Sequence, residues 1–385
     1  MQTADVVIVG GGIVGASVAW HLTEAGCRNV LIVEREAHQG KGSTGKSMGG
    51  VRAQFATKPN IQMSLYSIPF YAAFEERLGH PSGYRDQGYL FVATKPSHME
   101  YLQVNQILQK SLGLKQACMV TREEIVAIVP QLRADDVLGG SFCPTDGFVD
   151  PYSVMVGFTT RACEQGTTLW RSTEVTAINR DGAGITGVQT TRGEVSTRVV
   201  VNAAGAWAAE VAALAGINLP VEPMRRMLIP TEPFDGVSHE VPMVIDMTNG
   251  FHFRPESLGF LLAWNDPEET GFNTNFDPAF IEKVLTLAAD RVPCFENLAV
   301  NPKRAWAGLY EMSPDHHAII GQVEELPGLF CANGFSGHGV MHSPATGRMV
   351  AELILTGKTK VVDNVELLSP ARFAKGELLH ETAVL

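Results

Sequence analysis

The spacing of apolar residues changes twice before residue 34. Residues 4–9 are largely apolar and predict a buried strand, and residues 30–33 form a second short apolar run. Between them, residues 13–25 carry apolar side chains at helical spacing. The order strand, turn, helix and strand predicts a βαβ unit of parallel sheet at the amino end of the chain.

The turn of this unit carries the glycines of a dinucleotide-binding motif. Gly10 permits a tight turn, Gly12 lets a pyrophosphate approach backbone N–H groups, and Gly15 lets the helix pack close to the strand. Glu34 ends the second strand, about 20 residues after the last glycine, where an acid binds the adenosine ribose hydroxyls. A carboxylate there disfavours the 2′-phosphate of NADP but does not separate NAD from FAD.

Composition excludes several classes of protein. The chain has 385 residues and a formal net charge of -11, so it is expected to form two or three domains and to bind neither nucleic acid nor anionic lipid. No stretch reaches the ~20 apolar residues of a membrane span. The 6 cysteines lack the close pairs of a zinc site or a redox dithiol, so we expect no metal and a reducing, cytoplasmic location.

The segment after Glu34 makes the prediction more specific. "EREAHQGKGSTGKSMGGVRAQF" (residues 34–55) resembles the flavin-contacting segment of the D-amino-acid oxidase superfamily, nearest to the sarcosine oxidase and dimethylglycine dehydrogenase group. "RVVVNAAGAWAAEVAALAG" (198–216) and "GLFCANGFSGHGVMHSPATGRMVAELILTG" (328–357) extend the resemblance. In the last stretch, Ser343 and Pro344 predict a helix that begins near them. The resemblance implies that the start of this helix faces the pyrimidine end of the flavin.

The resemblance implies a two-domain flavoenzyme of the α/β and α+β classes. Its Rossmann-type FAD domain is expected to be discontinuous, comprising residues 1–80, 144–220 and 325–385. Residues 81–143 and 221–324 are expected to form a mixed-sheet substrate domain that covers the flavin ring.

The resemblance also assigns residues to the FAD site. These are Gly10, Gly12, Ile13, Val14, Gly15, Glu34, Arg35, Gly42, Ser43, Thr44, Lys46, Ser47, Met48, Gly49, Val175, Ala204, Gly205, Trp207, Gly308, Gly334, Gly337, His338, Gly339, Val340 and Met341. Gly308 stands where sarcosine oxidases carry a cysteine linked to the flavin, and Lys46 stands near the position of the linking histidine of dimethylglycine dehydrogenases. FAD is therefore expected to bind non-covalently.

Four residues are candidates for the substrate side of the flavin. Arg52 stands where the sarcosine oxidases hold the substrate carboxylate, and a guanidinium suits that task because its fork binds both oxygens. His252, Tyr310 and His342 complete the candidate catalytic set. Met341 replaces a second carboxylate-binding lysine of the sarcosine oxidases, so a different substrate or a different anchor is expected.

The resemblance therefore implies an oxidoreductase that transfers a hydride from a small secondary or tertiary amino acid, of the sarcosine, dimethylglycine or proline type, to FAD. The imine product would then hydrolyse. Leu261 and Gly49 stand where sarcosine oxidases carry basic residues over the ring, so an electron acceptor other than oxygen, and hence a dehydrogenase, is expected. Arg254 or His252 supplying the positive charge instead is the alternative. An FAD-dependent 2-hydroxy-acid dehydrogenase and a non-enzymatic flavoprotein assembly factor or subunit are the alternatives, and a partner subunit is possible.

Overall fold

The structure is a computed structural model that describes residues 2–266 and 269–383. In this part of the chain the largest α/β layer is a six-stranded sheet with strand order β19-β20-β13-β2-β3-β9. All its neighbouring strands run parallel except β19 and β20. The strand bounds are β2 Val6–Val9, β3 Val30–Val33, β9 Thr168–Trp170, β13 Val200–Asn202, β19 Ile319–Gln322 and β20 Leu329–Asn333.

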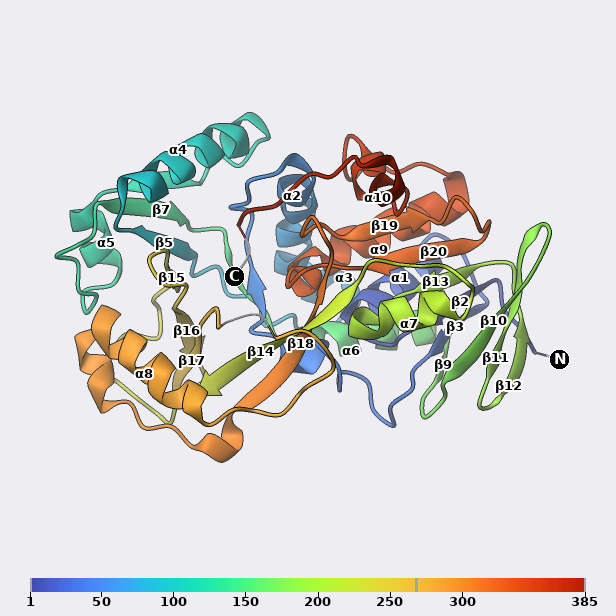
Figure 1. Cartoon of the computed structure of the whole chain (residues 1–385), viewed down its shortest axis with the longest axis horizontal. Coiled ribbons are helices and arrows are strands. Elements are labelled where there is room, and N and C mark those ends of the chain that lie inside the picture. The colour runs from blue at the N-terminus through green and yellow to red at the C-terminus, as the bar shows by residue number, and fades with distance from the viewer. Residues whose placement is uncertain (1, 267–268, 384–385) are drawn as a thin grey trace.

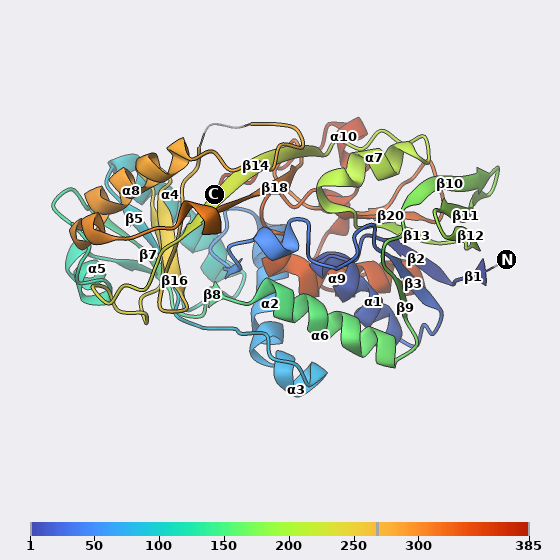
Figure 2. The ribbon, with the colours of Figure 1, turned by 90° about the horizontal axis from the view of Figure 1, so that it is seen from below.

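Helices cover one face of the six-stranded sheet. The buried helix α1 (Ile13–Glu24) packs against α6 (Pro151–Glu164) and α9 (Gly339–Thr356), and α2 (Lys58–Ala72) packs on α9 (Figure 2). The predicted strands and helix at the amino end are thus confirmed to within two residues at each end. The short helix α3 (Phe74–Leu78) follows α2.

The other face of this sheet is covered by a small sheet and a short helix. The small sheet has the order β1-β12-β11-β10, and its apolar residues pack with those of β2 and β3. Figure 1 shows it beside the amino terminus, with α7 in front of the six-stranded sheet. The bounds are β1 Gln2–Thr3, β10 Val175–Asp181, β11 Gly184–Thr190, β12 Gly193–Ser196 and α7 Ala208–Ala213.

A mixed eight-stranded sheet forms the second lobe, on the left of Figure 1. Its order is β18-β14-β17-β16-β15-β5-β7-β6, and one face packs on α8 (Ala279–Arg291). The strand bounds are β5 Tyr89–Ala93, β6 Cys118–Val120, β7 Gly139–Cys143, β14 Glu222–Pro230, β15 Met243–Asp246, β16 His252–Glu256, β17 Gly259–Ala263 and β18 Trp306–Met312. The predicted combination of an α/β layer with a mixed-sheet lobe is confirmed. The residue boundaries assigned to the two domains stay a prediction.

The remaining elements join the two lobes and cover their edges. The bounds are α4 Pro96–Ser111, α5 Arg122–Ile128, β4 Gly50–Val51, β8 Gly147–Phe148, η1 Thr44–Lys46, η2 Gly205–Trp207, η3 Pro293–Asn297, η4 Pro302–Arg304, η5 Val365–Leu368 and α10 Arg372–Lys375. After α10 the chain returns to the middle of the molecule, where Figure 1 marks the C-terminus. No described helix is long and apolar enough to cross a membrane.

Helix α9 corrects one expectation, because it begins at Gly339 and not near Ser343. Pro344 therefore lies inside the helix, where it cannot donate to the carbonyl of Val340 four residues earlier. The Tyr71 hydroxyl of α2 donates to that carbonyl instead, at 2.5 Å. A partner from another helix thus satisfies the acceptor that the proline leaves free, and no local sequence signal shows this.

Candidate functional site

A cavity of about 690 Å³ is lined by residues of both large sheets. Its walls include the glycine turn after β2, the start of α9 and the inner face of the eight-stranded sheet. The predicted FAD-contacting segments, which are far apart in the sequence, all contribute residues to this cavity. Of the predicted FAD contacts, only Gly15, Gly49 and Gly334 do not line it.

The glycine turn is built by close backbone contacts. Gly10 has φ +106°, and a Cβ there would lie 2.4 Å from the Ala203 carbonyl oxygen of the neighbouring strand. A Cβ at Gly15 would lie 2.0 Å from the Gly10 carbonyl oxygen, so Gly15 brings α1 against the turn instead of touching a ligand. Gly12 remains on the cavity wall at the start of α1, where N–H groups and the helix dipole favour an anion.

Glu34 is held in place at the end of β3. One carboxylate oxygen accepts a hydrogen bond from the Gly11 N–H at 3.0 Å, and the other accepts from the Glu36 N–H at 2.9 Å. The carboxylate lines the cavity and retains lone pairs for a further donor. This arrangement suits the binding of two neighbouring hydroxyl groups.

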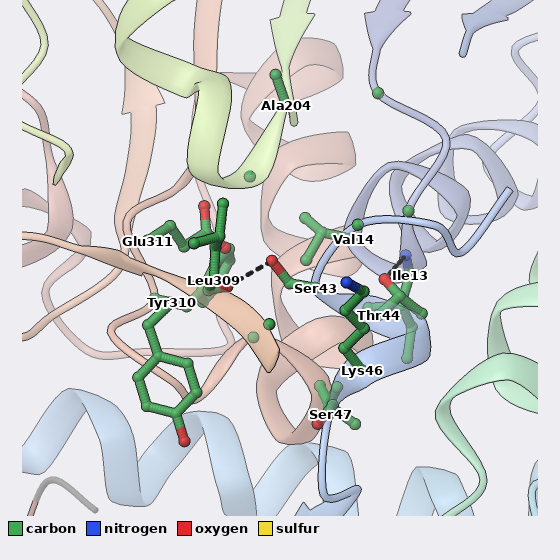
Figure 3. A pocket seen from close by; sticks show the side chains of 18 of the residues that line it. Ile13, Val14, Ser43, Thr44, Lys46, Ser47, Ala204, Leu309, Tyr310 and Glu311 are labelled. Atoms are coloured by element: carbon green, nitrogen blue, oxygen red, sulfur yellow. Dashed lines mark hydrogen bonds between the residues drawn. The ribbon is translucent and has the colours of Figure 1, made fainter. Parts of the chain in front are cut away.

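The loop after β3 joins the two sheets, as Figure 3 shows. Thr44 Oγ1 accepts from the Ile13 N–H at 3.1 Å, which attaches the loop to the start of α1. Ser43 Oγ donates to the Leu309 carbonyl at 2.7 Å. Lys46 Nζ donates to the Ala307 carbonyl at 2.8 Å. We call residues 43–46 the bridging loop, because it bonds to α1 on one side and to β18 on the other.

Strand register shows which side chains share the cavity face of the eight-stranded sheet. Arg226 of β14 lies opposite Gly308, and Ala263 of β17 lies opposite both Leu228 and His252. Directly opposed residues project to the same face. These residues and Tyr310 all line the cavity. A Cβ at Gly308 would lie 2.9 Å from the Lys46 Cβ, so this face approaches the bridging loop closely.

Arg52 is deeply buried, with 1% of its surface exposed. It lines the cavity, and its guanidinium carbon lies 3.9 Å from the centre of the Phe55 ring. Nη1 donates to the Gln54 carbonyl at 2.6 Å, while Nη2 donates to the Ala383 carbonyl and lies 3.5 Å from His338 Nε2. It forms no ion pair with any carboxylate of residues 2–266 and 269–383. A buried guanidinium of this kind is suited to an anionic ligand.

His252 and Tyr310 lie on the same sheet face. His252 Nδ1 lies 2.9 Å from the Gly250 carbonyl, so Nδ1 carries the proton and Nε2 is left as an acceptor. Burial lowers the pKa of His252 to about 4, and the charges of Arg226 and Arg52 contribute, so the ring is neutral at pH 7. Burial raises the pKa of Tyr310, which therefore keeps its phenolic proton.

His342 does not support the predicted catalytic role, because it does not line the cavity. Its Nε2 hydrogen bonds with Ser64 Oγ of α2 at 3.0 Å, and burial lowers its pKa to about 3. His338, one turn earlier, lines the cavity instead. The helix starts earlier than predicted, and only the first of the two histidines lies at its cavity end.

The structure also adds residues that the sequence did not indicate. Arg226 lines the cavity, and its guanidinium carbon lies 5.5 Å from the centre of the Tyr310 ring. Glu311 lines the cavity too and accepts a hydrogen bond from the Gly334 N–H at 3.0 Å. Burial raises the pKa of Glu311 to about 8, against the opposing effect of that hydrogen bond. Position on a strand was the available signal for both side chains, since Arg226 lies on β14 and Glu311 on β18, but it does not identify which strand face meets the cavity.

Glu311 predicts a pH dependence of stability. Its folded-state pKa lies above that of the unfolded chain. Its contribution to the free energy of unfolding is therefore fully present below about pH 4.5 and is lost as the pH rises towards 8. We expect Glu311→Gln, which cannot ionise, to flatten the fall in unfolding free energy of the apoprotein across this range. Urea titrations at several pH values measure the effect, with exposed Glu325→Gln as the control. Parallel curves for Glu311→Gln and the parent would contradict this assignment.

Comparison with known proteins agrees with this geometry. Residues 5–353 match the family described as FAD dependent oxidoreductase, or DAO. The chain is 34% identical to FAD-dependent oxidoreductase domain-containing protein 1 of Xenopus laevis, over 100% of this chain and 85% of that protein. It is 28% identical to mitochondrial dimethylglycine dehydrogenase of Rattus norvegicus, over 97% of this chain and 45% of that enzyme.

Two solved structures show the same architecture. L-proline dehydrogenase from P. horikoshii superimposes with a TM-score of 0.92 at 33% identity, covering 98% of this chain and 99% of that one. Glycine oxidase from Geobacillus kaustophilus gives a TM-score of 0.84 at 26% identity, covering 97% and 99%. The resemblance inferred from the glycine-rich segments is thus confirmed, and the chain belongs to the DAO family of FAD-dependent oxidoreductases.

Proposed function

We propose that this protein is an FAD-dependent dehydrogenase of a small secondary or tertiary amino acid. The observation that carries the proposal is Arg52, a buried cation on the wall of the cavity that has no carboxylate partner among the described residues. The names of three similar proteins contain dimethylglycine, proline and glycine, and each of these compounds combines an amine with a carboxylate. A carboxylate anchor beside the flavin site suits each of them.

The residues of the cavity fit FAD. Gly10 and Gly12 leave a side-chain-free turn at the start of α1 for the pyrophosphate, and Glu34 offers acceptors for the ribose hydroxyls. The start of α9 reaches the same cavity through Gly339 and Val340. The positive end of that helix would stabilise negative charge on the pyrimidine end of a reduced ring. When bound, FAD supplies the acceptor for a hydride from the carbon beside the amine.

The side chains around the ring would position the substrate. Arg52 receives the carboxylate, and the long 3.5 Å contact of Nη2 with His338 is the interaction that can yield to a carboxylate oxygen. Neutral His252 Nε2 can accept a hydrogen bond from the substrate amine. Protonated Tyr310 can donate one. Holding the substrate in one orientation is the main contribution of the protein to such a transfer.

The observations favour this proposal over the alternatives. A 2-hydroxy acid would also use Arg52, but its hydroxyl proton requires a base, and a histidine with a pKa of about 4 is a weak one. A non-enzymatic role would not need a buried guanidinium that faces the cavity.

We expect Arg52→Met to lose the bidentate carboxylate contact, because methionine removes the fork and keeps comparable bulk. The loss in kcat/KM should be on the order of 2 to 4 kcal/mol for carboxylate substrates, while neutral amines are spared. Anaerobic flavin bleaching with sarcosine, dimethylglycine, proline and lactate measures it. Arg52→Lys, which keeps the charge without the fork, serves as the matched control. Equal rates for Arg52→Met and the parent with every acid would make Arg52 structural.

Non-covalent FAD has a direct test. No cysteine stands at Gly308, and a side chain there would press on Lys46. Acid precipitation of the purified yellow protein should therefore leave the flavin in the supernatant. A pellet that retains its flavin spectrum would show a covalent link.

The electron acceptor is proposed to be a quinone or an electron-transfer protein instead of oxygen. Leu261 packs with Leu228, Ala263 and Met48. Arg254, opposite Leu261 on β16, is ion-paired with Glu256 and does not line the cavity. We therefore expect little electrostatic help for the first electron transfer to oxygen. Flavin reduced anaerobically by substrate should reoxidise slowly in air-saturated buffer and rapidly with an artificial quinone. Leu261→Lys should speed the reaction with oxygen, whereas uncharged Leu261→Met should not. Rapid reoxidation of the parent by oxygen would refute the proposal.

A further inference from the structure

The segment after α10, residues 377–383, reaches Arg52, whose guanidinium donates to the Ala383 carbonyl. Glu381 in this segment has only 1% of its surface exposed. Its backbone N–H donates to the Asp315 carbonyl at 3.1 Å, and Thr382 Oγ1 hydrogen bonds with the Tyr101 hydroxyl of α4 at 3.1 Å. The segment is thus fixed to parts of both lobes.

The Glu381 carboxylate binds the start of helix α2. One oxygen accepts from the Ala56 N–H at 3.1 Å, and the other accepts from Thr57 Oγ1 at 2.7 Å and Asn60 Nδ2 at 3.0 Å. Thr57 is the residue before the helix, and its own side chain makes no capping bond to the backbone. A carboxylate here is favoured by the free N–H groups and by the helix dipole. Burial raises the pKa of Glu381, but these hydrogen bonds and the charge of Arg52 outweigh that effect and hold the pKa below its ordinary value.

The same carboxylate orients the end of the segment. It accepts from the Ala383 N–H at 2.9 Å, and the Ala383 carbonyl in turn accepts from Arg52 Nη2. The Gln54 carbonyl accepts from Nη1, on the other terminal nitrogen of the guanidinium. Two acceptors on the two terminal nitrogens determine the rotation of a planar group, whereas one acceptor leaves it free to turn.

We propose that Glu381 is a positioning residue for the carboxylate anchor: it holds the Ala383 carbonyl, which fixes the Arg52 guanidinium in the orientation that receives the substrate carboxylate. The inference rests on the proposed function, because it assigns Arg52 to the substrate. Glu381 itself acts through the segment and makes no hydrogen bond to Arg52.

The experiment compares binding of acetate and acetamide to the holoenzyme, followed by flavin absorbance. The two ligands have the same shape and differ in charge, so a misoriented guanidinium weakens acetate selectively. We expect Glu381→Ala to raise the Kd of acetate and the substrate KM about 10-fold, the factor that corresponds to ~1.4 kcal/mol, and to leave kcat and acetamide binding nearly unchanged. Exposed Glu377→Ala in the same segment is the matched control and should change neither.

A double-variant cycle separates positioning from general weakening. In the Arg52→Met background, Glu381→Ala should have no further effect on acetate, because the group that it orients is gone. Glu381→Gln, which keeps one oxygen for the Ala56 and Ala383 N–H groups, should lie between the parent and Glu381→Ala, and it provides the test where Glu381→Ala does not fold. Equal weakening of acetate and acetamide, unchanged acetate binding, or additive effects with Arg52→Met would overturn the inference alone. Acetate binding that is absent from the parent or unaffected by Arg52→Met would overturn the anchor, and with it the proposed function.

Discussion

The contact between α1 and the turn that precedes it determines where everything else in the site can lie. At Gly15 there is no space for even one methyl group beside the Gly10 carbonyl, so the helix begins directly against the end of β2. Its first N–H groups are then fixed at the edge of the parallel sheet, where α/β proteins of this kind bind phosphate groups. The bridging loop is bonded to this helix start through Thr44, so the start of the helix also fixes the position of the loop.

The eight-stranded sheet is placed relative to that helix by hydrogen bonds instead of by a continuous core. Its outer face packs on α8 and forms a separate apolar cluster, while its cavity face carries Arg226, His252 and Tyr310. The bridging loop and η2 both contact β18, and Gln54 hydrogen bonds with Tyr89 of β5 and Ser141 of β7. These contacts align the cofactor side of the cavity with its substrate side.

The sequence predicted the parts of the site whose signals are local. Glycine spacing, the strand that ends in Glu34 and the hairpin that carries His252 each follow from residues close together in the chain. The start of α9 was misplaced because Pro344 is tolerated inside the helix, where Tyr71, far away in sequence, satisfies the freed carbonyl. His342 was a candidate because it stands beside Met341, but its side chain contacts Ser64 of α2. The Ala383 contact of Arg52 was equally invisible, since nothing in residues 377–383 resembles a binding motif.

The bridging loop has a further consequence for how this fold can change its substrate. Two of its hydrogen bonds to β18 end on the backbone carbonyls of Ala307 and Leu309, and a third is donated by the Trp306 indole to the Lys46 carbonyl. Any residue can occupy positions 307 and 309 without removing the two backbone acceptors, and Tyr310 beside them lines the cavity. Substitutions at Tyr310 can therefore reshape the substrate pocket while Trp306 and the two carbonyls keep the bridging loop where it is. Related enzymes could in this way accept different amines while the segments that contact the cofactor stay the same.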